Sequence, residues 1–376
     1  MKKDSVLLLG GGLAGLIAAI HLSRIGIQVT VIERNGYPKH KVCGEYISNE
    51  VLSYLDWLDC NLAPLNPTSI TRLQFSTAKG KSIWSELPLG GFGISRYALD
   101  SFLSKKAIDN GCNIIQETVE SVTFENDMFE VITTNTNIFK SKIVIGAFGK
   151  RSNIDQKTNR DFINHKSPWL AVKGHYLVDY PNDLVGLHNF KGGYCGVSQV
   201  EDKVVNICYL ADYDTFKQYK NLEEYQQAVV AQNPHLKTIF KNARLLFEKP
   251  LTISQISFDK KQAVDNHILM IGDTAGLIHP LCGNGMAMAI HSAKIVSEVV
   301  AGYYADAQPD RAKMERKYAK AWDFNFKSRL RFGRWLALLF QKPLLSEVVL
   351  KLLLYFPFLL TIIIKKTHGK PIILPT

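Results

Sequence analysis

Two side chains with acid–base potential lie close together in one loop of this sequence. Cys43 and Glu45 occur in "YPKHKVCGEYIS", residues 37–48, which follows an apolar strand ending at Glu33. A thiol can donate a proton or, once ionised, attack an electrophile. A carboxylate can orient a substrate or relay a proton, and a solvated loop carboxylate fits the sequence equally well. Cys43 is therefore a candidate proton donor, substrate contact or packing residue, and Glu45 a candidate catalytic residue.

A glycine pattern precedes this loop and indicates what the loop serves. Gly10, Gly12 and Gly15 form G-x-G-x-x-G between a predicted strand, Val6–Leu9, and a predicted helix, Leu16–Arg24. The glycines permit a tight turn, close approach of a pyrophosphate and close packing of helix on strand. Glu33 ends the next strand, Ile27–Ile32, 18 residues beyond Gly15, where a carboxylate can bind both ribose hydroxyls. The pattern predicts FAD or NAD without a 2′-phosphate.

A second glycine-rich segment, residues 269–293, has the same order of strand, glycine turn and helix late in the chain. Gly272 and Asp273 follow a short predicted strand, Leu269–Ile271, and Gly283 and Gly285 precede a helix predicted from Met286. An Asp at a strand end can bind a ribityl or ribose hydroxyl. A glycine turn at a helix N-terminus presents free N–H groups and the positive end of the helix dipole to an anion. In a flavoprotein this anion is the N1/O2 region of the reduced flavin.

Composition narrows the class of partner. The 376 residues are 46% hydrophobic and carry a net charge of +11. No basic–aromatic motif supports nucleic-acid binding, so anionic lipid is the better explanation of the charge. The cysteines form no CxxC pair, which favours reduced thiols in a cytoplasmic protein, and they lie at positions 43, 60, 112, 195, 208 and 282. The histidines, among them 165, 175, 188 and 235, show no metal-type spacing, so no metal site is predicted.

These motifs together resemble the p-hydroxybenzoate-hydroxylase-like flavoproteins. The resemblance rests on the first glycine motif with Glu33-Arg34, "GISRYALDSFL" (93–103), "IVIGAFGKRSNI" (143–154) and "GDTAGLIHPLCGNGMAMAI" (272–290). It implies non-covalent FAD, with Arg96 near the pyrophosphate and NAD(P)H or another reductant as a transient electron donor. The cofactor contacts that it implies are Gly10, Gly12, Leu13, Ala14, Gly15, Glu33, Arg34, Lys41, Cys43, Arg96, Val119, Gly272, Asp273, Gly283, Gly285 and Met286.

One branch of this family is the most similar. Pro38-x-x-x-x-Cys43-Gly44 resembles the P-x-x-x-x-C-G motif of geranylgeranyl reductases, in which the cysteine lies beside the flavin ring. Gly193-Tyr194 matches the start of their Gly-Tyr-x-Trp-x-x-Pro strand, but Gly196 and Gln199 replace the Trp and Pro. The resemblance thus adds Tyr194 to the candidate catalytic residues. Phe148 stands where aromatic hydroxylases usually have Asp, and the W-x-W-x-I-P motif of tryptophan halogenases is absent.

The expected fold is α/β, with a Rossmann-like FAD-binding domain, an interleaved β-sheet substrate domain and a helical C-terminal tail. Residues 1–70, 95–160 and 260–310 are assigned to the FAD domain, and 70–94 with 165–258 to the substrate domain. The tail, 311–376, is first basic and then apolar.

The apolar part of the tail allows two interpretations. Its uninterrupted run, Leu352–Ile364, has 13 residues with Pro357 in the middle, short of the ~20 that cross a bilayer. The helices could pack over the substrate domain. The interpretation we favour is a peripheral hairpin, within 335–366, that dips into a membrane beside its lysines.

Three functions follow from these features. The first is an FAD oxidoreductase that reduces C=C bonds of a prenyl or polyene lipid. The second is a monooxygenase that hydroxylates a phenolic lipid or alkene. The third is a flavin electron-transfer or binding protein with no substrate of its own, which would serve a protein partner.

Overall fold

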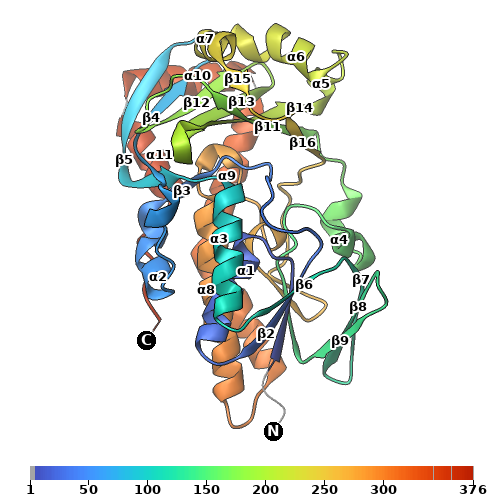
Figure 1. Cartoon of the computed structure of the whole chain (residues 1–376). Coiled ribbons are helices and arrows are strands. Elements are labelled where there is room, and N and C mark those ends of the chain that lie inside the picture. Colours follow the sequence, from blue (N-terminus) through green and yellow to red (C-terminus); the bar gives the residue numbers. More distant parts are fainter. Residues whose placement is uncertain (1–4, 342, 357, 376) are drawn as a thin grey trace.

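The computed structural model describes residues 5–341, 343–356 and 358–375. Pro357, in the middle of the apolar run of the tail, lies outside this range. Two lobes, each built on its own sheet, are stacked along the long axis of the molecule (Figure 1).

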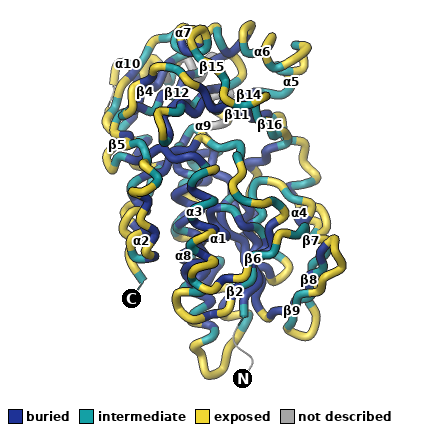
Figure 2. Tube along the Cα trace, viewed as in Figure 1, coloured by how far each residue is buried: buried dark blue, intermediate teal, exposed yellow. Residues whose placement is uncertain are grey.

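The lower lobe in Figure 1 contains a six-stranded sheet in the order β17-β18-β10-β1-β2-β6. All neighbours are parallel except β17, which pairs antiparallel with β18. The central strands are nearly continuous apolar runs because helices and loops cover both of their faces (Figure 2). The strands are β1 (Ser5–Leu9), β2 (Gln28–Glu33), β6 (Asn113–Gln116), β10 (Ile143–Gly146), β17 (Val264–Asp265) and β18 (Ile268–Met270).

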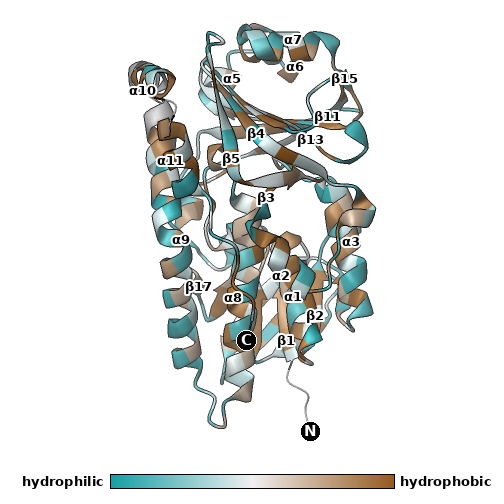
Figure 3. Cartoon of the chain, turned by 90° about the vertical axis from the view of Figure 1, so that its left-hand side faces the viewer, coloured by the Kyte–Doolittle hydropathy of each residue, from teal (hydrophilic) through white to brown (hydrophobic). Residues whose placement is uncertain are grey.

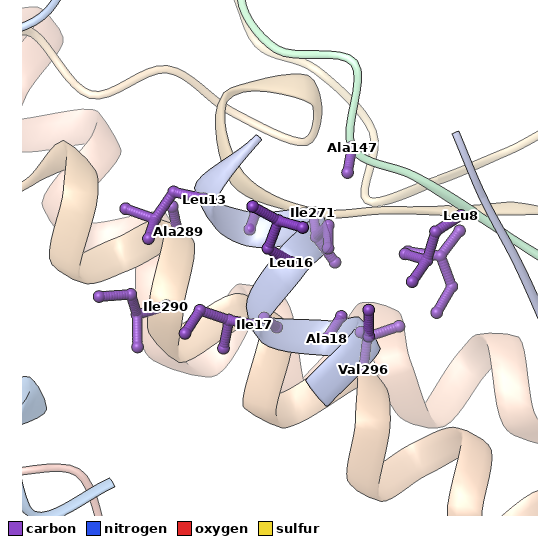
Figure 4. Packing of buried hydrophobic residues seen from close by; sticks show 14 of the residues in the cluster. Leu8, Leu13, Leu16, Ile17, Ala18, Ala147, Ile271, Ala289, Ile290 and Val296 are labelled. Carbon is purple, nitrogen blue, oxygen red and sulfur yellow. The ribbon is translucent and has the colours of Figure 1, made fainter. Parts of the chain in front are cut away.

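Three helices, α1 (Leu13–Arg24), α3 (Arg96–Asp109) and α8 (Gly285–Ala305), lie side by side next to this sheet (Figure 1). Close packing of α1 against α8 is visible in Figure 4, where Ile17 lies near Ile290. Around them lie α2 (Leu52–Trp57), α4 (Asn153–Lys157) and a separate three-stranded sheet of β7 (Val119–Glu125), β8 (Met128–Thr133) and β9 (Ile138–Ser141). This packing fixes the N-termini of α1 and α8 at the upper edge of the lower sheet.

The upper lobe is a large mixed sheet in the order β15-β11-β14-β13-β12-β4-β5-β3, with β16 also paired to β11. The small helices α5 (Tyr213–Phe216), α6 (Leu222–Ala228) and α7 (Pro234–Asn242) cover its outer face around buried Tyr225 and Leu236. The strands are β3 (Tyr46–Ser48), β4 (Thr68–Ser76), β5 (Ser82–Gly93), β11 (Trp169–Leu177), β12 (Leu184–Phe190), β13 (Gly193–Gln199), β14 (Val205–Asp212), β15 (Arg244–Leu245) and β16 (Leu251–Ser254).

The C-terminal helices join the two lobes. Helix α9 (Arg311–Gln341) has 31 residues, about 46 Å at 1.5 Å per residue, and runs from the lower lobe to the upper one (Figure 3). Helices α10 (Pro343–Tyr355) and α11 (Phe358–Thr367) then pack on the upper sheet, where Leu353, Leu360 and Ile364 are buried. No helix within the described ranges is both long and apolar enough to cross a bilayer.

The predicted fold class is confirmed, and the structure adds detail to the predicted boundaries. Strand β3 lies within residues 1–70, which were assigned to the FAD domain, yet it pairs with β5 in the upper sheet. Helix α9 begins where the predicted basic part of the tail begins, at Arg311, and runs to Gln341. The tail packs one face on the upper sheet, as the first of its two interpretations expected.

Two helical glycines give a matched test of the α1 packing. A Cβ atom added at Gly15 would lie 2.0 Å from the Gly10 carbonyl oxygen, whereas one at Gly302 would meet only the Lys317 Nζ, at 3.9 Å. We expect Gly15→Ala to lower the free energy of unfolding by roughly 3 kcal/mol, because the clash is with rigid backbone. Gly302→Ala should instead raise it by roughly 0.5–1 kcal/mol, since alanine favours a helix. Urea denaturation followed by circular dichroism measures both, and equal effects would contradict the predicted close contact.

Candidate active site

The first glycine motif forms an open cradle at the N-terminus of α1. Gly10 adopts φ +106°, and a Cβ atom there would lie 2.5 Å from the Ala147 carbonyl oxygen, so only glycine fits. Gly12 has open space beside it: the nearest atoms to an added Cβ are the Arg96 Nη2 at 3.4 Å and the Lys41 Nζ at 3.6 Å. Two cations therefore converge on the backbone where a pyrophosphate is expected.

One carboxylate holds these cations in place. Asp100 accepts two hydrogen bonds of 2.7 Å from Arg96, and its Oδ2 lies 3.3 Å from the Lys41 Nζ. Two positive charges share a single buried negative charge, so the group keeps a surplus positive charge. With the positive end of the α1 dipole, this surplus suits a bound diphosphate.

The buried Glu33 lies at the other end of the cradle. Its Oε2 accepts a hydrogen bond of 2.8 Å from the Gly11 amide, and its Oε1 accepts one of 3.0 Å from the Asn35 amide. Tyr37 Oη donates to the Gly11 carbonyl at 2.5 Å. Glu33 thus shapes the glycine turn besides being available to a ribose.

The second glycine segment meets the first. Gly272 adopts φ +58°, its amide donates to Ser292 Oγ at 2.9 Å, and a Cβ atom there would lie 3.0 Å from the Ala14 Cβ. Asp273 is half-buried; its backbone carbonyl accepts a hydrogen bond from Lys261 Nζ at 3.0 Å. The Gly-Asp turn is therefore pressed against the first turn of α1.

The N-terminus of α8 is held by a buried carboxylate. Asn284, between Gly283 and Gly285, donates a hydrogen bond of 3.0 Å from Nδ2 to Glu50 Oε2. The same Glu50 Oε2 accepts the Gly369 amide at 2.7 Å, and Glu50 Oε1 lies 3.5 Å from Arg329 Nη1. We call Glu50, Asn284, Arg329 and Gly369 the Glu50 clamp. It fixes the turn whose N–H groups and helix dipole would face an anionic ring edge.

The Cys43 loop is anchored to the upper sheet. Asn206 Nδ2, on β14, donates to the carbonyl oxygens of Cys43 at 3.3 Å and Gly44 at 2.9 Å. Cys43 is half-buried against the main core, whereas Cys60 and Cys112 are buried. The loop therefore lies between the two lobes, and its contact with the flavin ring stays a prediction.

Glu45 is completely buried, so the alternative of a solvated loop carboxylate is wrong. Its carboxylate pairs with the buried Lys173 Nζ, lies 2.7 Å from His175 Nε2 and accepts the Arg96 amide at 2.7 Å. Burial alone raises the pKa of Glu45, but Lys173 and the hydrogen bond from His175 outweigh it and hold that pKa below its ordinary 4.5. Glu45 is thus an anion that links the Cys43 loop, β11 and the start of α3.

An apolar cavity of about 130 Å³ lies between these segments and the tail. Gly44, Cys282 and Gly283 border it from the flavin-motif side, and Tyr194 and Gly196 border it from the upper sheet. Each of the sequence's three Cys-Gly pairs thus contributes a residue to one cavity. The remaining wall comes from the tail and β4, with Leu73, Phe75, Leu353, Leu360, Ile364 and, next to Gly283, His368.

Similarity to known proteins agrees with this geometry. A family model for pyridine nucleotide-disulphide oxidoreductases matches residues 5–64. Digeranylgeranylglycerophospholipid reductase 2 of Methanothermobacter thermautotrophicus is 23% identical over 370 residues, which cover 89% of this chain and 88% of that protein. A geranylgeranyl bacteriochlorophyll reductase-like protein from Thermoplasma acidophilum shares the fold, with a TM-score of 0.70, 20% identity and coverage of 89% and 87%. The chain is an FAD-dependent oxidoreductase. Its sequence and fold are similar to those of geranylgeranyl reductases.

The same fold also occurs in a halogenating enzyme. The flavin-dependent brominase Bmp2 superimposes with a TM-score of 0.80 at 16% identity, over 97% of this chain and 93% of that one. The oxidoreductase therefore has a scaffold that supports more than one flavin chemistry.

The structure brings most of the predicted cofactor residues of the oxidoreductase together. Leu13, Ala14, Gly15 and Met286 lie buried at the facing starts of α1 and α8. Val119 is buried at the start of β7, and Arg34 is exposed. Their individual contacts with FAD stay predictions, but the open space at Gly12, the paired cations and the two helix N-termini fit the cofactor.

Several residues of this site were not predicted. Glu50, Arg329 and Lys173 carry no local motif, and their partners lie far away in the sequence. His175, one of the histidines without metal-type spacing, belongs to the Glu45 network. Within the described part of the chain, no group of three His, Cys, Asp or Glu side chains could hold a metal ion.

The Glu45 network gives a prediction for stability. Glu45→Ala leaves Lys173 as an unpaired buried cation, so we expect the free energy of unfolding to fall by about 3–5 kcal/mol. Glu45→Ala combined with Lys173→Met should recover much of that loss, because no buried charge is left. Urea denaturation of the flavin-loaded protein measures both changes. A double variant no more stable than Glu45→Ala would contradict this electrostatic account.

The wild-type protein and the double variant should also differ in how urea-measured stability changes in acid. Because the folded pKa of Glu45 lies below 4.5, its ionisation stabilises the native protein above that pH. This stabilisation is lost as the pH falls from 4.5 through the lower folded pKa, and the double variant should lack this component.

Proposed function

We propose that this oxidoreductase reduces carbon–carbon double bonds of a prenyl or polyene lipid bound in the apolar cavity. The observation that carries the proposal is the position of the cavity, whose walls include both predicted flavin-facing segments, Gly44 and Pro280–Gly283. The remaining walls are mainly aliphatic and aromatic, which suits a hydrocarbon chain. The relationship to digeranylgeranylglycerophospholipid reductases supports a prenyl substrate.

Reduction of a C=C bond adds two electrons and two protons in total. FAD, when bound and reduced, supplies a hydride, and the protein must deliver the remaining proton. Tyr194 and Cys208 border the cavity in their protonated forms: burial raises the pKa of Tyr194 well above its ordinary value and that of Cys208 to about 12. Cys43, in the loop beside Gly44, is a third candidate donor.

Gly196 stands where the geranylgeranyl reductase motif has Trp, and this difference changes the space available to the substrate. A Cβ atom added there would meet only the Cys208 carbonyl oxygen, at 3.6 Å, and the Leu187 Cδ2, at 3.8 Å. The position therefore opens into the cavity. Glycine in place of the tryptophan of related reductases would leave room for a bulkier or differently placed lipid.

A second candidate function is oxygen-dependent modification of a phenolic lipid or alkene. The observation in its favour is the match of the whole fold to the brominase Bmp2. Both reactions need reduced FAD and the same apolar cavity, so they differ in whether substrate turnover consumes O₂.

The reaction can be tested with a cavity-filling variant. The wild-type protein is reduced anaerobically with NADH, NADPH or reduced ferredoxin, and the flavin absorbance is followed after a polyprenyl lipid is added. We expect reoxidation of the flavin and a saturated lipid product without O₂. Gly196→Trp should slow this lipid-dependent reoxidation by about tenfold or more, because the indole occupies the cavity, while FAD content stays normal.

Leu177→Trp serves as the control, since Leu177 is 39% exposed on β11 of the same sheet. If no product forms anaerobically and turnover consumes O₂ in proportion to substrate, the reductase proposal is wrong. The oxygen-dependent function is then the one supported.

We also propose that the tail rests on a membrane surface from which the lipid enters. On α10 and α11, large apolar side chains are exposed, among them Leu352 (45%), Tyr355 (80%) and Phe358 (61%). Lys351, Lys365 and Lys366 are exposed beside them. Exposed aromatics flanked by lysines suit an anionic lipid interface.

A liposome experiment tests this membrane contact. Tyr355→Ser combined with Phe358→Ser should weaken binding to anionic liposomes by about tenfold, because less apolar area enters the interface. Wild-type binding should also fall with added salt, as the lysines are screened within ~8 Å at physiological ionic strength. Ile108→Ser combined with Ile138→Ser, at exposed positions of the lower lobe, is the control. A wild-type protein that does not bind these liposomes would refute the membrane contact.

A further inference from the structure

His368, at the end of α11, carries a buried hydrogen-bond acceptor with no partner in the protein. Its Nδ1 lies 3.1 Å from the Ile364 carbonyl oxygen and 3.1 Å from Thr367 Oγ1. The Thr367 hydroxyl donates its own proton to the Ile364 carbonyl at 3.0 Å, so both neighbours act as acceptors. The proton of the neutral imidazole must therefore be on Nδ1.

The other ring nitrogen, Nε2, is then left with a free lone pair. It is shielded from solvent and has no hydrogen-bond partner among the described residues. Burial lowers the pKa of His368, so the ring is neutral at physiological pH and Nε2 accepts rather than donates. A buried acceptor without a donor is unfavourable, which points to a ligand group that completes it.

The position of the His368 ring indicates where a ligand group that donates to Nε2 would lie. His368 borders the apolar cavity, and its Cε1 would lie 4.0 Å from a Cβ atom added at Gly283 in the flavin-binding turn. The Tyr46 ring meets it edge-on, with centroids 6.2 Å apart. The acceptor is thus at the flavin-motif end of the cavity, and the aliphatic walls extend away from it.

The Glu50 clamp holds this acceptor in place. The residue after His368, Gly369, donates its amide to Glu50, and the Ile372 amide donates to the Glu50 carbonyl oxygen at 2.8 Å. A Cβ atom at Gly369 would lie 2.3 Å from Glu50 Oε1, so a larger residue here would displace the carboxylate of the clamp. The end of α11 is therefore fixed relative to the α8 turn, which Glu50 also binds.

We propose that His368 determines specificity by accepting a hydrogen bond at Nε2 from a hydroxyl group of the lipophilic substrate. This inference rests on the proposed function and defines the substrate class further, as a lipid alcohol or phenol. Because the acceptor lies beside the flavin-binding turn, the hydroxyl lies within a few bonds of the carbon that reacts. The hydrocarbon part then fills the cavity toward Leu73 and Leu353.

The test compares farnesol with farnesyl methyl ether, which has the same chain but cannot donate a hydrogen bond. Binding of each tritiated lipid to the flavin-loaded protein is measured by equilibrium dialysis, which does not depend on turnover. We expect the wild-type protein to bind the alcohol about tenfold more tightly than the ether. His368→Phe should remove this difference, and His368→Gln, whose Oε1 can replace the acceptor, should restore part of it.

His267→Phe is the matched control, because His267 is exposed near Phe124 in the lower lobe and should leave the difference intact. Equal affinity of the wild type for the two lipids overturns the inference, and this comparison stands even if His368→Phe folds poorly. Discrimination that persists in folded His368→Phe also overturns it. Failure of the wild type to bind either lipid overturns the proposed lipid-binding function together with the inference.

Discussion

The buried pair of Glu45 and Lys173 is the interaction on which the arrangement of this site depends. Both side chains are fully shielded from water, so the cost of burying each charge is offset only while the other is present. Lys173 belongs to the upper sheet, and Glu45 also binds the first amide of α3 in the lower lobe. A rotation between the lobes would pull the Glu45 carboxylate away from Lys173 or from this α3 amide. The pair therefore fixes the lobes relative to each other where the Cys43 loop passes between them.

Arg96 connects this pair to the predicted cofactor cradle. Its backbone amide binds Glu45, and its guanidinium binds Asp100 beside Gly12. One residue thus connects the upper sheet to the predicted pyrophosphate site. The Glu50 clamp performs a similar role for the second flavin segment, because it ties the α8 turn to α9 and to the end of α11. The two carboxylates lie five positions apart in the chain, on either side of β3.

The structural elements that depend on a few neighbouring residues could be predicted from the sequence. The strands around Gly10 and Glu33 lie within one residue of their predicted limits, since apolar runs and glycine turns define them locally. Lys41 and Arg96, which the family resemblance names as cofactor contacts, lie next to each other beside Gly12. The environment of Glu45 was not predictable, because its partner is 128 residues away and a lone Glu in a glycine-containing loop looks solvated. The roles of His368 and Glu50 could not be predicted either, because the residues around them also come from distant parts of the sequence.

The location of the cavity wall has a consequence for how the protein is made. Gly369 and Glu50 are 319 residues apart, so their contact closes one of the longest loops of the chain. The strands and glycine turns of the lower sheet come from residues 5–285, which a ribosome completes well before α10 and α11 emerge. During synthesis the cofactor cradle is therefore complete while the apolar inner face of the upper sheet is still uncovered. A nascent chain at this stage exposes an apolar, aggregation-prone surface, which the final two helices cover and turn into the wall of the cavity.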